Sequence, residues 1–131
     1  MTPITILIVD DERVTLEMLV MIMEIERPAW TVYGVEGGQA ALDIVAEHDI
    51  DLALLDIAMP EMDGIELCRR LREIPKMAQA PIVMFTGFDT QERRERAREA
   101  GADDYWLKPF LPSQLVPKIE QLIEAAQATK E

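Results

Sequence analysis

Cysteine, basic residues and long apolar runs are all scarce in this sequence. Cys68 is the only cysteine, so no disulfide can form within the chain. The apolar run over residues 4–9 is too short for a secretory signal, and no run approaches the roughly 18 residues of a membrane span. The 13 Lys and Arg residues are outnumbered by 25 Asp and Glu residues, and such an acidic surface repels the phosphates of nucleic acids and anionic membranes. We therefore expect a cytoplasmic domain that binds neither nucleic acid nor a membrane directly.

Apolar runs and helical patterns alternate along the 131 residues of the chain. Five runs are typical of buried strands: Ile4–Val9, Trp30–Val35, Leu52–Leu55, Ile82–Phe85 and Tyr105–Leu107. Five segments have the apolar spacing of helices: Glu12–Glu26, Gln39–Glu47, Ile65–Ile74, Gln91–Ala100 and Val116–Gln127. Each predicted strand is thus followed by a predicted helix.

This strict alternation predicts an α/β fold. Helix-length connections imply right-handed crossovers, a parallel sheet and helices on both of its faces. Five strands fit the doubly wound, flavodoxin-like order 2-1-3-4-5, in which ligands bind at the carboxyl ends of strands 1 and 3. We expect one domain over residues 1–127 and a frayed tail, or the start of a linker, over residues 128–131.

A proline lies inside the last helical pattern. Pro117 has no N–H to donate within a helix, and Ser113, four residues earlier, is a good residue to cap one. The pattern therefore predicts that Pro117 delays the start of the last helix.

Three acidic residues lie at neighbouring strand ends. Asp10 and Asp11 follow the first strand and Asp56 follows the third, and the predicted topology brings these ends together. Carboxylates so close repel one another unless a cation joins them, and their hard oxygen ligands suit Mg²⁺ or Mn²⁺. The alternative is that Asp10 or Asp11 caps the first helix, which does not account for Asp56.

A hydroxyl and an amine end the remaining strands of this edge. Thr86 follows the fourth strand and Lys108 follows the fifth. A carboxylate nucleophile, a metal ion, a hydrogen-bond donor and a fixed cation are what phosphoryl transfer to an aspartate needs, because the charge on the phosphoryl oxygens must be neutralised. Taken singly, Thr86 and Lys108 could equally be surface residues.

In combination, these motifs resemble the response-regulator receiver family from about residue 4 to residue 125. The resemblance rests on Ile6–Asp11 (ILIVDD), Leu54–Pro60 (LLDIAMP), Asp63-Gly64, Thr86-Gly87 and Gly101–Phe110 (GADDYWLKPF). It implies a regulatory phosphoacceptor rather than an ordinary enzyme. Its partner would be a sensor histidine kinase or a histidine phosphotransfer protein.

The family pattern also implies roles for the acidic residues. By resemblance, Asp56 accepts the phosphoryl group from a phosphohistidine of the partner. Asp11 and Asp56 would bind Mg²⁺ directly, Asp10 would bind it through water, and the backbone carbonyl of Ala58 would be a further ligand.

The family's switch residues match Lys108, Thr86 and Tyr105. By resemblance, Lys108 pairs with the phosphoryl oxygens, Thr86 swings toward them and Tyr105 turns inward, so that the surface of helix 4, strand 5 and helix 5 changes. The alternative for Tyr105 is ordinary packing with a hydrated hydroxyl. The resemblance also implies a cis peptide bond between Lys108 and Pro109.

Two positions that vary in the family influence how long the phosphoryl group lasts. They are Ala58, two residues after the phosphoacceptor, and Phe88, two residues after the threonine. Neither side chain can activate water, so we expect slow self-hydrolysis.

The predicted first helix has few polar residues. The family register would turn four of its residues toward the sheet: Met18, Leu19, Ile22 and Met23. This would leave Leu16, Val20 and Met21 exposed as a docking surface for the partner, unless they are only scattered surface apolar residues.

Other functions remain open at this point. Flavodoxin-like folds also bind flavin phosphates, but those need a Ser-, Thr- and Gly-rich loop where this chain has Asp10, Asp11 and Glu12. Aspartyl phosphatases also use an aspartate nucleophile with Mg²⁺, but they carry it on the first strand with a second acid two residues later. A phosphorylation-independent interaction module is a further alternative. The chain could act alone or as the receiver portion of a longer regulator, with a downstream effector or output domain and a possible phosphorylation-dependent homodimer.

Overall fold

A five-stranded parallel sheet forms the centre of the computed structural model, which describes residues 3–130. The strands are β1 (Thr5–Val9), β2 (Thr31–Val35), β3 (Leu52–Leu55), β4 (Ile82–Thr86) and β5 (Asp104–Leu107). Their order is β2-β1-β3-β4-β5. The strands β2 and β3 lie on opposite sides of β1, so the order of the strands switches direction between β1 and β3. The α/β fold class and the strand order predicted from sequence are confirmed.

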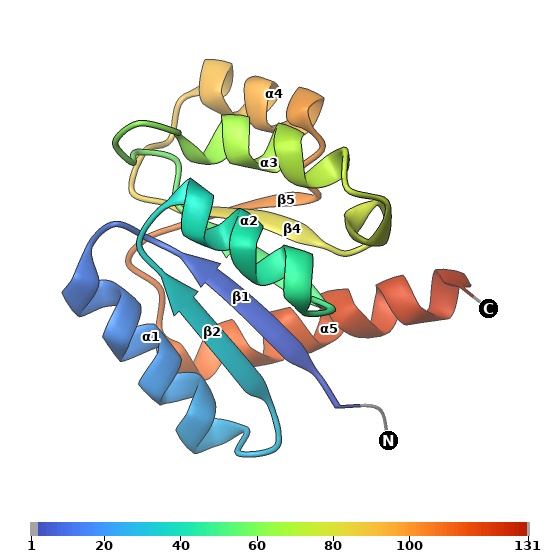
Figure 1. The fold of residues 1–131 in the computed structure, drawn as a ribbon. Coiled ribbons are helices and arrows are strands. Elements are labelled where there is room, and N and C mark those ends of the chain that lie inside the picture. Colours follow the sequence, from blue (N-terminus) through green and yellow to red (C-terminus); the bar gives the residue numbers. More distant parts are fainter. Residues whose placement is uncertain (1–2, 131) are drawn as a thin grey trace.

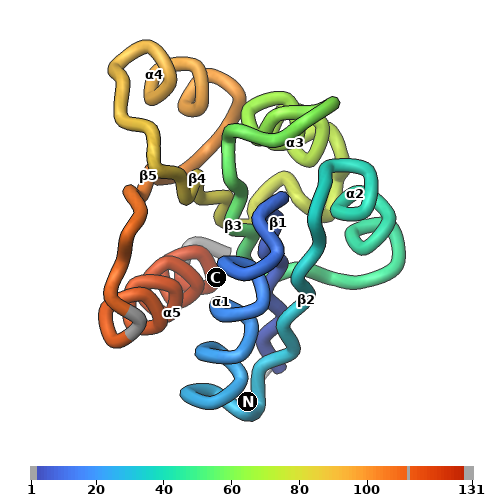
Figure 2. Tube along the Cα trace, turned by 90° about the vertical axis from the view of Figure 1, so that its left-hand side faces the viewer, coloured from blue at the N-terminus to red at the C-terminus, as the bar shows by residue number. Residues whose placement is uncertain are grey.

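Helices connect the strands and cover both faces of the sheet. They are α1 (Arg13–Glu26), α2 (Gly38–Glu47), α3 (Gly64–Arg72), α4 (Gln91–Ala100) and α5 (Pro112–Lys130), with a short 3₁₀ helix, η1, over Pro75–Met77. Helices α1 and α5 lie on one face, while α2, α3 and α4 lie on the other (Figures 1 and 2). Among the helices of residues 3–130, none combines the length and apolarity that crossing a membrane requires.

Two apolar clusters hold these layers together. One lies between the sheet and α2, α3 and α4, and the other lies between the sheet and α1 and α5. All residues of β3 and β4 are buried, because helices cover both faces of these central strands. The uniformly apolar runs in the sequence reflect this double burial.

The start of α5 differs from the prediction. The helix begins at Pro112, and the carbonyl of Leu111 accepts hydrogen bonds from the N–H groups of Gln114 and Leu115 at 2.9 and 3.2 Å. Pro117 lies inside the helix and Ser113 is a helical residue, so the expected cap and delayed start are wrong.

The free energy gained by packing α5 against the sheet exceeds the cost of this proline. An interior proline costs about 3 kcal/mol, whereas each buried aliphatic side chain contributes about 1.5–3 kcal/mol. Four such side chains of α5 are buried: Leu115, Val116, Ile119 and Ile123. The helix also continues to Lys130, beyond the predicted end at Gln127. Glu131 lies outside the described residues, and the division at residue 127 stays a prediction.

The register predicted for α1 is wrong in part, although Leu19 and Met23 are buried and Ile22 is half-buried as expected. Leu16 is buried and Val20 is half-buried, whereas Met18 is 48% exposed. The reason lies in strand β2, where Gly34 has no side chain. A Cβ atom at Gly34 would lie 2.7 Å from a methyl group of Val20 and 3.0 Å from one of Leu16. Helix α1 therefore packs Leu16 and Val20 over this glycine.

The exposed face of α1 is consequently a different set of apolar residues. They share one side of the helix, at spacings of four, three and four residues, opposite the buried side. This stripe consists of Val14 (76% exposed), Met18 (48%), Met21 (56%) and Ile25 (70%). Of the expected docking residues, only Met21 belongs to it.

Candidate functional site

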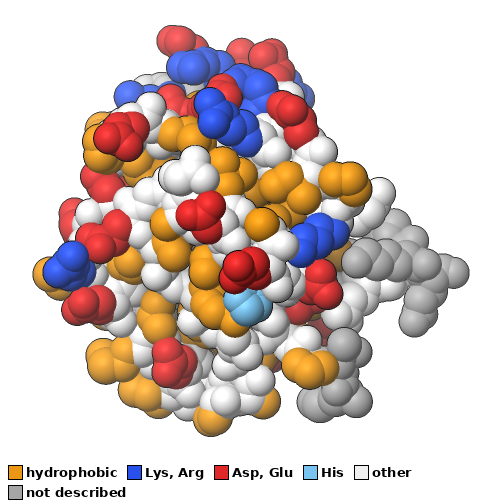
Figure 3. Space-filling model, in the orientation of Figure 1, with side chains coloured by type: hydrophobic (Ala, Val, Ile, Leu, Met, Phe, Trp, Pro, Cys, Tyr) orange, Lys and Arg blue, Asp and Glu red, His pale blue; other side chains and the backbone are white. Residues whose placement is uncertain are grey.

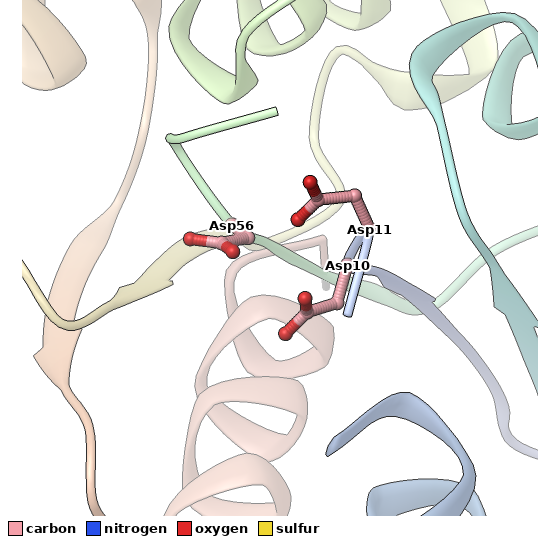
Figure 4. A group of neighbouring side chains, drawn as sticks. All are labelled: Asp10, Asp11 and Asp56. Carbon is pink, nitrogen blue, oxygen red and sulfur yellow. The ribbon is translucent and has the colours of Figure 1, made fainter. Parts of the chain in front are cut away.

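Three carboxylates meet at the carboxyl ends of β1 and β3. Asp10 and Asp11 follow β1, and Asp56 follows β3, its neighbour in the sheet. One oxygen from each carboxylate lies within 4.8 Å of the other two. Figure 4 shows the three side chains gathered around one space at this edge of the sheet. The sequence-predicted convergence of these acids is therefore present in the fold.

Asp10 is the buried member of this group, at 2% exposure. Its Oδ1 atom accepts a hydrogen bond of 2.9 Å from the N–H of Glu12, just before α1. Its Oδ2 atom accepts one of 2.5 Å from the ammonium group of Lys108. Asp10 thus holds both the turn before α1 and the lysine. The N-cap residue of α1 is Glu12, and no side chain caps this helix, so the alternative in which Asp10 or Asp11 caps it is wrong.

Asp56 is half-buried at the start of the loop from β3 to α3. Burial raises the pKa of its carboxyl group above the ordinary value; the nearby ammonium of Lys108 lowers it, while the carboxylates of Asp10 and Asp11 raise it further. A cation bound beside Asp56 would lower this pKa, because a nearby positive charge favours the ionised carboxylate.

Gly64 allows α3 to begin directly beside the backbone of Asp56. A Cβ atom at this position would lie 2.0 Å from the carbonyl oxygen of Asp56, closer than any real contact. Asp63 caps the helix, because its Oδ1 atom accepts a hydrogen bond of 2.8 Å from the N–H of Glu66. The Asp63-Gly64 pair therefore fixes how the loop returns past Asp56.

The donor set of this site fits a hard divalent cation. Two oxygens bound to one Mg²⁺ lie at most about 4.2 Å apart, since each Mg–O distance is about 2.1 Å. The three carboxylate oxygens, within 4.8 Å of one another, approach this limit before any side chain moves. Asp11 is exposed, which leaves room for the water ligands that Mg²⁺ usually keeps.

Thr86 and Lys108 end the neighbouring strands of the same edge. Thr86 is the last residue of β4 and is fully buried, and its hydroxyl oxygen accepts a hydrogen bond of 3.3 Å from the N–H of Phe88. The ammonium of Lys108 lies 3.5 Å from a carboxylate oxygen of Asp56. The Lys108–Pro109 peptide bond is cis, as the resemblance implied.

Tyr105 lies in β5 with its ring half-buried against α4. Its hydroxyl group donates a hydrogen bond of 2.5 Å to the backbone carbonyl of Phe88. Burial raises the pKa of this hydroxyl, partly offset by the guanidinium groups of Arg94 and Arg93. Phe88 is 47% exposed, and Ala58 is exposed in the loop after β3.

Sequence reasoning missed the side chains that surround Tyr105 and Phe88. The guanidinium carbon of Arg94 lies 4.6 Å from the centroid of the Tyr105 ring, and that of Arg93 lies 4.4 Å from the centroid of the Phe88 ring. In the sequence these arginines belong to a run of charges in α4, which is more typical of a solvated face. No local pattern signals that two of them stack on aromatic rings.

Comparison with known proteins gives one consistent family. The model of the response regulator receiver domain matches residues 6–120 of the chain. The transcriptional regulatory protein SrrA of Staphylococcus aureus is 38% identical over 124 residues, which cover 95% of this chain and 49% of that protein. The chain thus spans about half the length of the curated relatives it matches.

Solved structures share the whole fold. A CheY-like response regulator receiver domain protein from Methanospirillum hungatei superposes with a TM-score of 0.90 at 29% identity, covering 98% of this chain and 99% of that one. A putative response regulator from Chloroflexus aurantiacus superposes with a TM-score of 0.83 at 32% identity, covering 94% and 99%. With its carboxylate cluster, its strand order and its match to the family model, the chain belongs to the response regulator receiver domain family of two-component systems.

Proposed function

We propose that this domain is a phosphorylation-dependent switch whose phosphoryl group is carried on Asp56. The observation that supports it most is the arrangement of three carboxylates and the ammonium of Lys108 at one edge of the sheet. In the transfer, an oxygen of Asp56 forms a bond to phosphorus while the bond from phosphorus to the partner's imidazole nitrogen breaks. The electron pair of that bond stays on the imidazole.

Asp11 and Asp56 would hold Mg²⁺ directly, with Asp10 contributing through water and Ala58 through its backbone carbonyl. The ion supplies neutralisation of the charge on the phosphoryl oxygens. Lys108 neutralises part of the same charge with its ammonium group, and the hydroxyl of Thr86 donates a hydrogen bond to the phosphoryl group. Mn²⁺ could replace Mg²⁺ because it prefers the same oxygen ligands.

Movement of Thr86 and Tyr105 would then change the surface of α4, β5 and α5. This surface would act on a downstream effector or on an output domain in a longer chain, in keeping with a relative named as a transcriptional regulatory protein. The change could also create a phosphorylation-dependent homodimer. The domain itself is acidic, so we propose that it does not bind nucleic acid directly.

The exposed stripe of α1 is the proposed docking surface for the phosphohistidine partner, either a sensor histidine kinase or a histidine phosphotransfer protein. Helix α1 begins two residues after Asp11, so the stripe runs from the phosphorylation site along the helix. Its methionines, Met18 and Met21, have the flexible side chains that suit adaptable contacts. Leu16 does not belong to this surface, because it is buried between α1 and the sheet.

The test is the intact mass of the protein after incubation with acetyl phosphate and Mg²⁺. We expect a gain of one phosphoryl group that disappears with a chelator and in Asp56→Asn. The matched control is Asp49→Asn, which removes an exposed carboxyl group elsewhere and should be phosphorylated normally. A folded protein that gains no phosphoryl group, from either acetyl phosphate or a phosphohistidine donor, would overturn the proposal and favour a phosphorylation-independent interaction module.

A further inference from the structure

Strand β2 is an edge strand of the sheet, and part of its backbone is unpaired. The N–H of Thr31 and the carbonyl of Val35 form hydrogen bonds on the side of β1, at 2.9 and 3.1 Å. Because backbone groups alternate in direction along a strand, those of Val32 and Gly34 point away from the sheet. In the part of the chain that the structure describes, these outward groups have no hydrogen-bond partner.

The edge at β2 lacks the protection that edge strands usually have. Its sequence, TVYGV, contains neither a proline nor a charged residue, and Gly34 is exposed. The other edge strand, β5, begins with a charged residue, Asp104, whose carboxylate accepts a hydrogen bond of 2.8 Å from the N–H of Tyr105. The edge at β2 is therefore the one that is open to a further strand.

A groove of about 570 Å³ lies between this open edge and α1. The side of α1 that lines it contributes four apolar residues: Leu16, Val20, Met21 and Ile25. On the side of the sheet, the groove is lined by Gly34 and Val35. An extended segment beside β2 would thus bond to free backbone groups and bury its own apolar side chains against α1.

The charged groups of this groove are mainly acidic. Glu17 and Glu24 of α1 and Glu36 after β2 line it, and all three are exposed. Arg13 is the only basic residue among its described lining residues, and it is already paired with Glu36 at 3.2 Å. Glu17 and Glu24 form no ion pair with any other residue of 3–130. The groove therefore has two carboxylates available for basic groups of a partner.

The charge of the whole chain argues against a second copy as the occupant. Figure 3 shows orange and red side chains over the region of α1 and β2, at the lower left of the view, with little blue among them. A second copy, with its formal net charge of −12, would bring further acidic groups to this face. A basic segment is complementary to it.

We propose that this groove binds an extended, basic segment of a partner protein, which adds to the sheet as a sixth strand beside β2. Glu17 and Glu24 are separated by two helical turns, about 10.5 Å. Residues four apart in a strand share a face and lie about 13 Å apart, so two long basic side chains at this spacing reach both carboxylates. An apolar residue between them packs on Val20 and Met21. The pattern of the segment is therefore basic–x–apolar–x–basic.

This inference goes beyond the proposed phosphorylation of Asp56 and does not depend on it. The groove lies on the side of α1 that faces β2, and it shares only Met21 and Ile25 with the exposed stripe. The two surfaces are therefore tested separately.

The probe is a fluorescein-labelled peptide of sequence KTVTKTVTK, whose binding to the full chain is followed by fluorescence anisotropy. We expect the double variant Glu17→Gln, Glu24→Gln to bind about threefold to tenfold more weakly than the wild type, the effect of losing two exposed ion pairs. The matched control is Glu47→Gln, which removes an exposed carboxyl group from α2, outside the groove, and should bind like the wild type. Thermal unfolding confirms that each variant is folded.

Two N-methylated forms of the peptide test strand addition itself. One is methylated on the backbone nitrogens of the threonines and the other on those of the valines and the central lysine, so only one of them loses the N–H groups that face β2. We expect that form to bind at least about tenfold more weakly than the other, because its hydrogen bonds to the edge are lost. Equal affinities of the two forms would overturn strand addition, since both keep all the charges.

Amide hydrogen exchange, measured by NMR, locates the contact. Binding of the peptide should slow the exchange of Val32 and Gly34, because their N–H groups gain partners. No saturable binding up to about 1 mM peptide would overturn the proposal. Slow exchange of both amides in the protein alone, increasing with its concentration, would show that a second copy covers β2 and would overturn the basic partner.

Discussion

The ammonium group of Lys108 lies 2.5 Å from a carboxylate oxygen of Asp10, although 98 residues separate them in the sequence. The same nitrogen is 3.5 Å from Asp56, so Asp10 is its closer partner. Asp10 is buried, which strengthens its attraction for a nearby cation. Lys108 therefore already supplies part of the positive charge that the three carboxylates require.

Lys108 and a divalent cation should consequently compete for these carboxylates. We expect Lys108→Gln to bind Mg²⁺ about tenfold more tightly than the wild type, because a positive charge next to the site is removed. Isothermal titration calorimetry measures this affinity directly. Lys76→Gln, which removes an ammonium group beside the exposed Asp49, should bind Mg²⁺ like the wild type. Weaker binding by Lys108→Gln would show that the lysine supports the metal site instead.

The phosphoryl group should be long-lived, because neither Ala58 nor Phe88 can orient or activate water. We expect Phe88→Asn to shorten the lifetime of the aspartyl phosphate by at least about tenfold, since the amide can hold an attacking water molecule. Phe88→Leu keeps an apolar side chain but removes the stacking on Arg93, so its lifetime should stay close to that of the wild type. Following the phosphorylated mass over time after removal of the donor gives these lifetimes. Loss of the wild-type phosphoryl group within seconds would contradict this prediction.

Two apolar residues of α1 should respond to substitution in opposite ways. Met18→Glu places a charge on the exposed stripe, so it should leave stability nearly unchanged but slow phosphotransfer from a histidine phosphotransfer protein by about tenfold. Leu16→Ala instead creates a cavity under the helix and should lower the free energy of unfolding by about 2–4 kcal/mol. Phosphorylation of Met18→Glu by acetyl phosphate should be normal. A loss with both donors would mean that the stripe is not a docking surface.

Arg72 should be one of the most important polar side chains for stability. Its guanidinium donates hydrogen bonds to the carbonyls of Gly101, Met77 and Ala80 and to a carboxylate oxygen of Asp103, at distances of 2.6–2.9 Å. Arg72→Ala leaves the three carbonyls without this donor, while Asp103 keeps the N–H of Ile82. We therefore expect the free energy of unfolding, measured by chemical denaturation, to fall by about 2–4 kcal/mol.

A second arginine of α3 provides the control for Arg72. Arg70 is half-exposed and pairs with Glu66 on the surface. Arg70→Ala should change stability far less than Arg72→Ala, because exposed ion pairs contribute little. Equal effects of the two substitutions would show that the hydrogen bonds of Arg72 stabilise the fold no more than an exposed ion pair does.

The thiol of Cys68 should be unreactive in the folded protein. Burial raises its pKa from 9.0 to about 11, so little thiolate forms near pH 8, and iodoacetamide should label the folded chain much more slowly than the denatured one. The folded state keeps this proton at a pH where the unfolded chain loses it. The associated stability is complete below pH 9 and falls as pH rises toward 11, by up to about 1.4 kcal/mol per pH unit.

Cys68→Ala isolates this effect from the titration of other groups. Its free energy of unfolding should fall less steeply between pH 9 and pH 11 than that of the wild type. The measurement is urea denaturation at a series of pH values. Parallel curves for the two proteins would mean that the thiol titrates alike in the folded and unfolded states.

Local patterns in the sequence are enough to predict the strands, their order and the carboxylate cluster. Short runs such as Leu52–Leu55 are typical of strands covered on both faces, and alternation with helices predicts a parallel sheet. Parallel strands end at the same edge, so residues that follow them, such as Asp11 and Asp56, must meet there. These predictions depend on local patterns and on a topology that admits few alternatives.

The buried side of α1 and the start of α5 depend instead on tertiary packing. Helix α1 is apolar on nearly every side, so its register depends on the space above Gly34 rather than on its own periodicity. Pro117 is tolerated because packing of the surrounding helix outweighs one missing hydrogen bond. The stacking of Arg94 on Tyr105 likewise joins distant positions that no local pattern relates. Local sterics and periodicity set the elements, whereas the shapes of the surfaces that meet set how those elements pack.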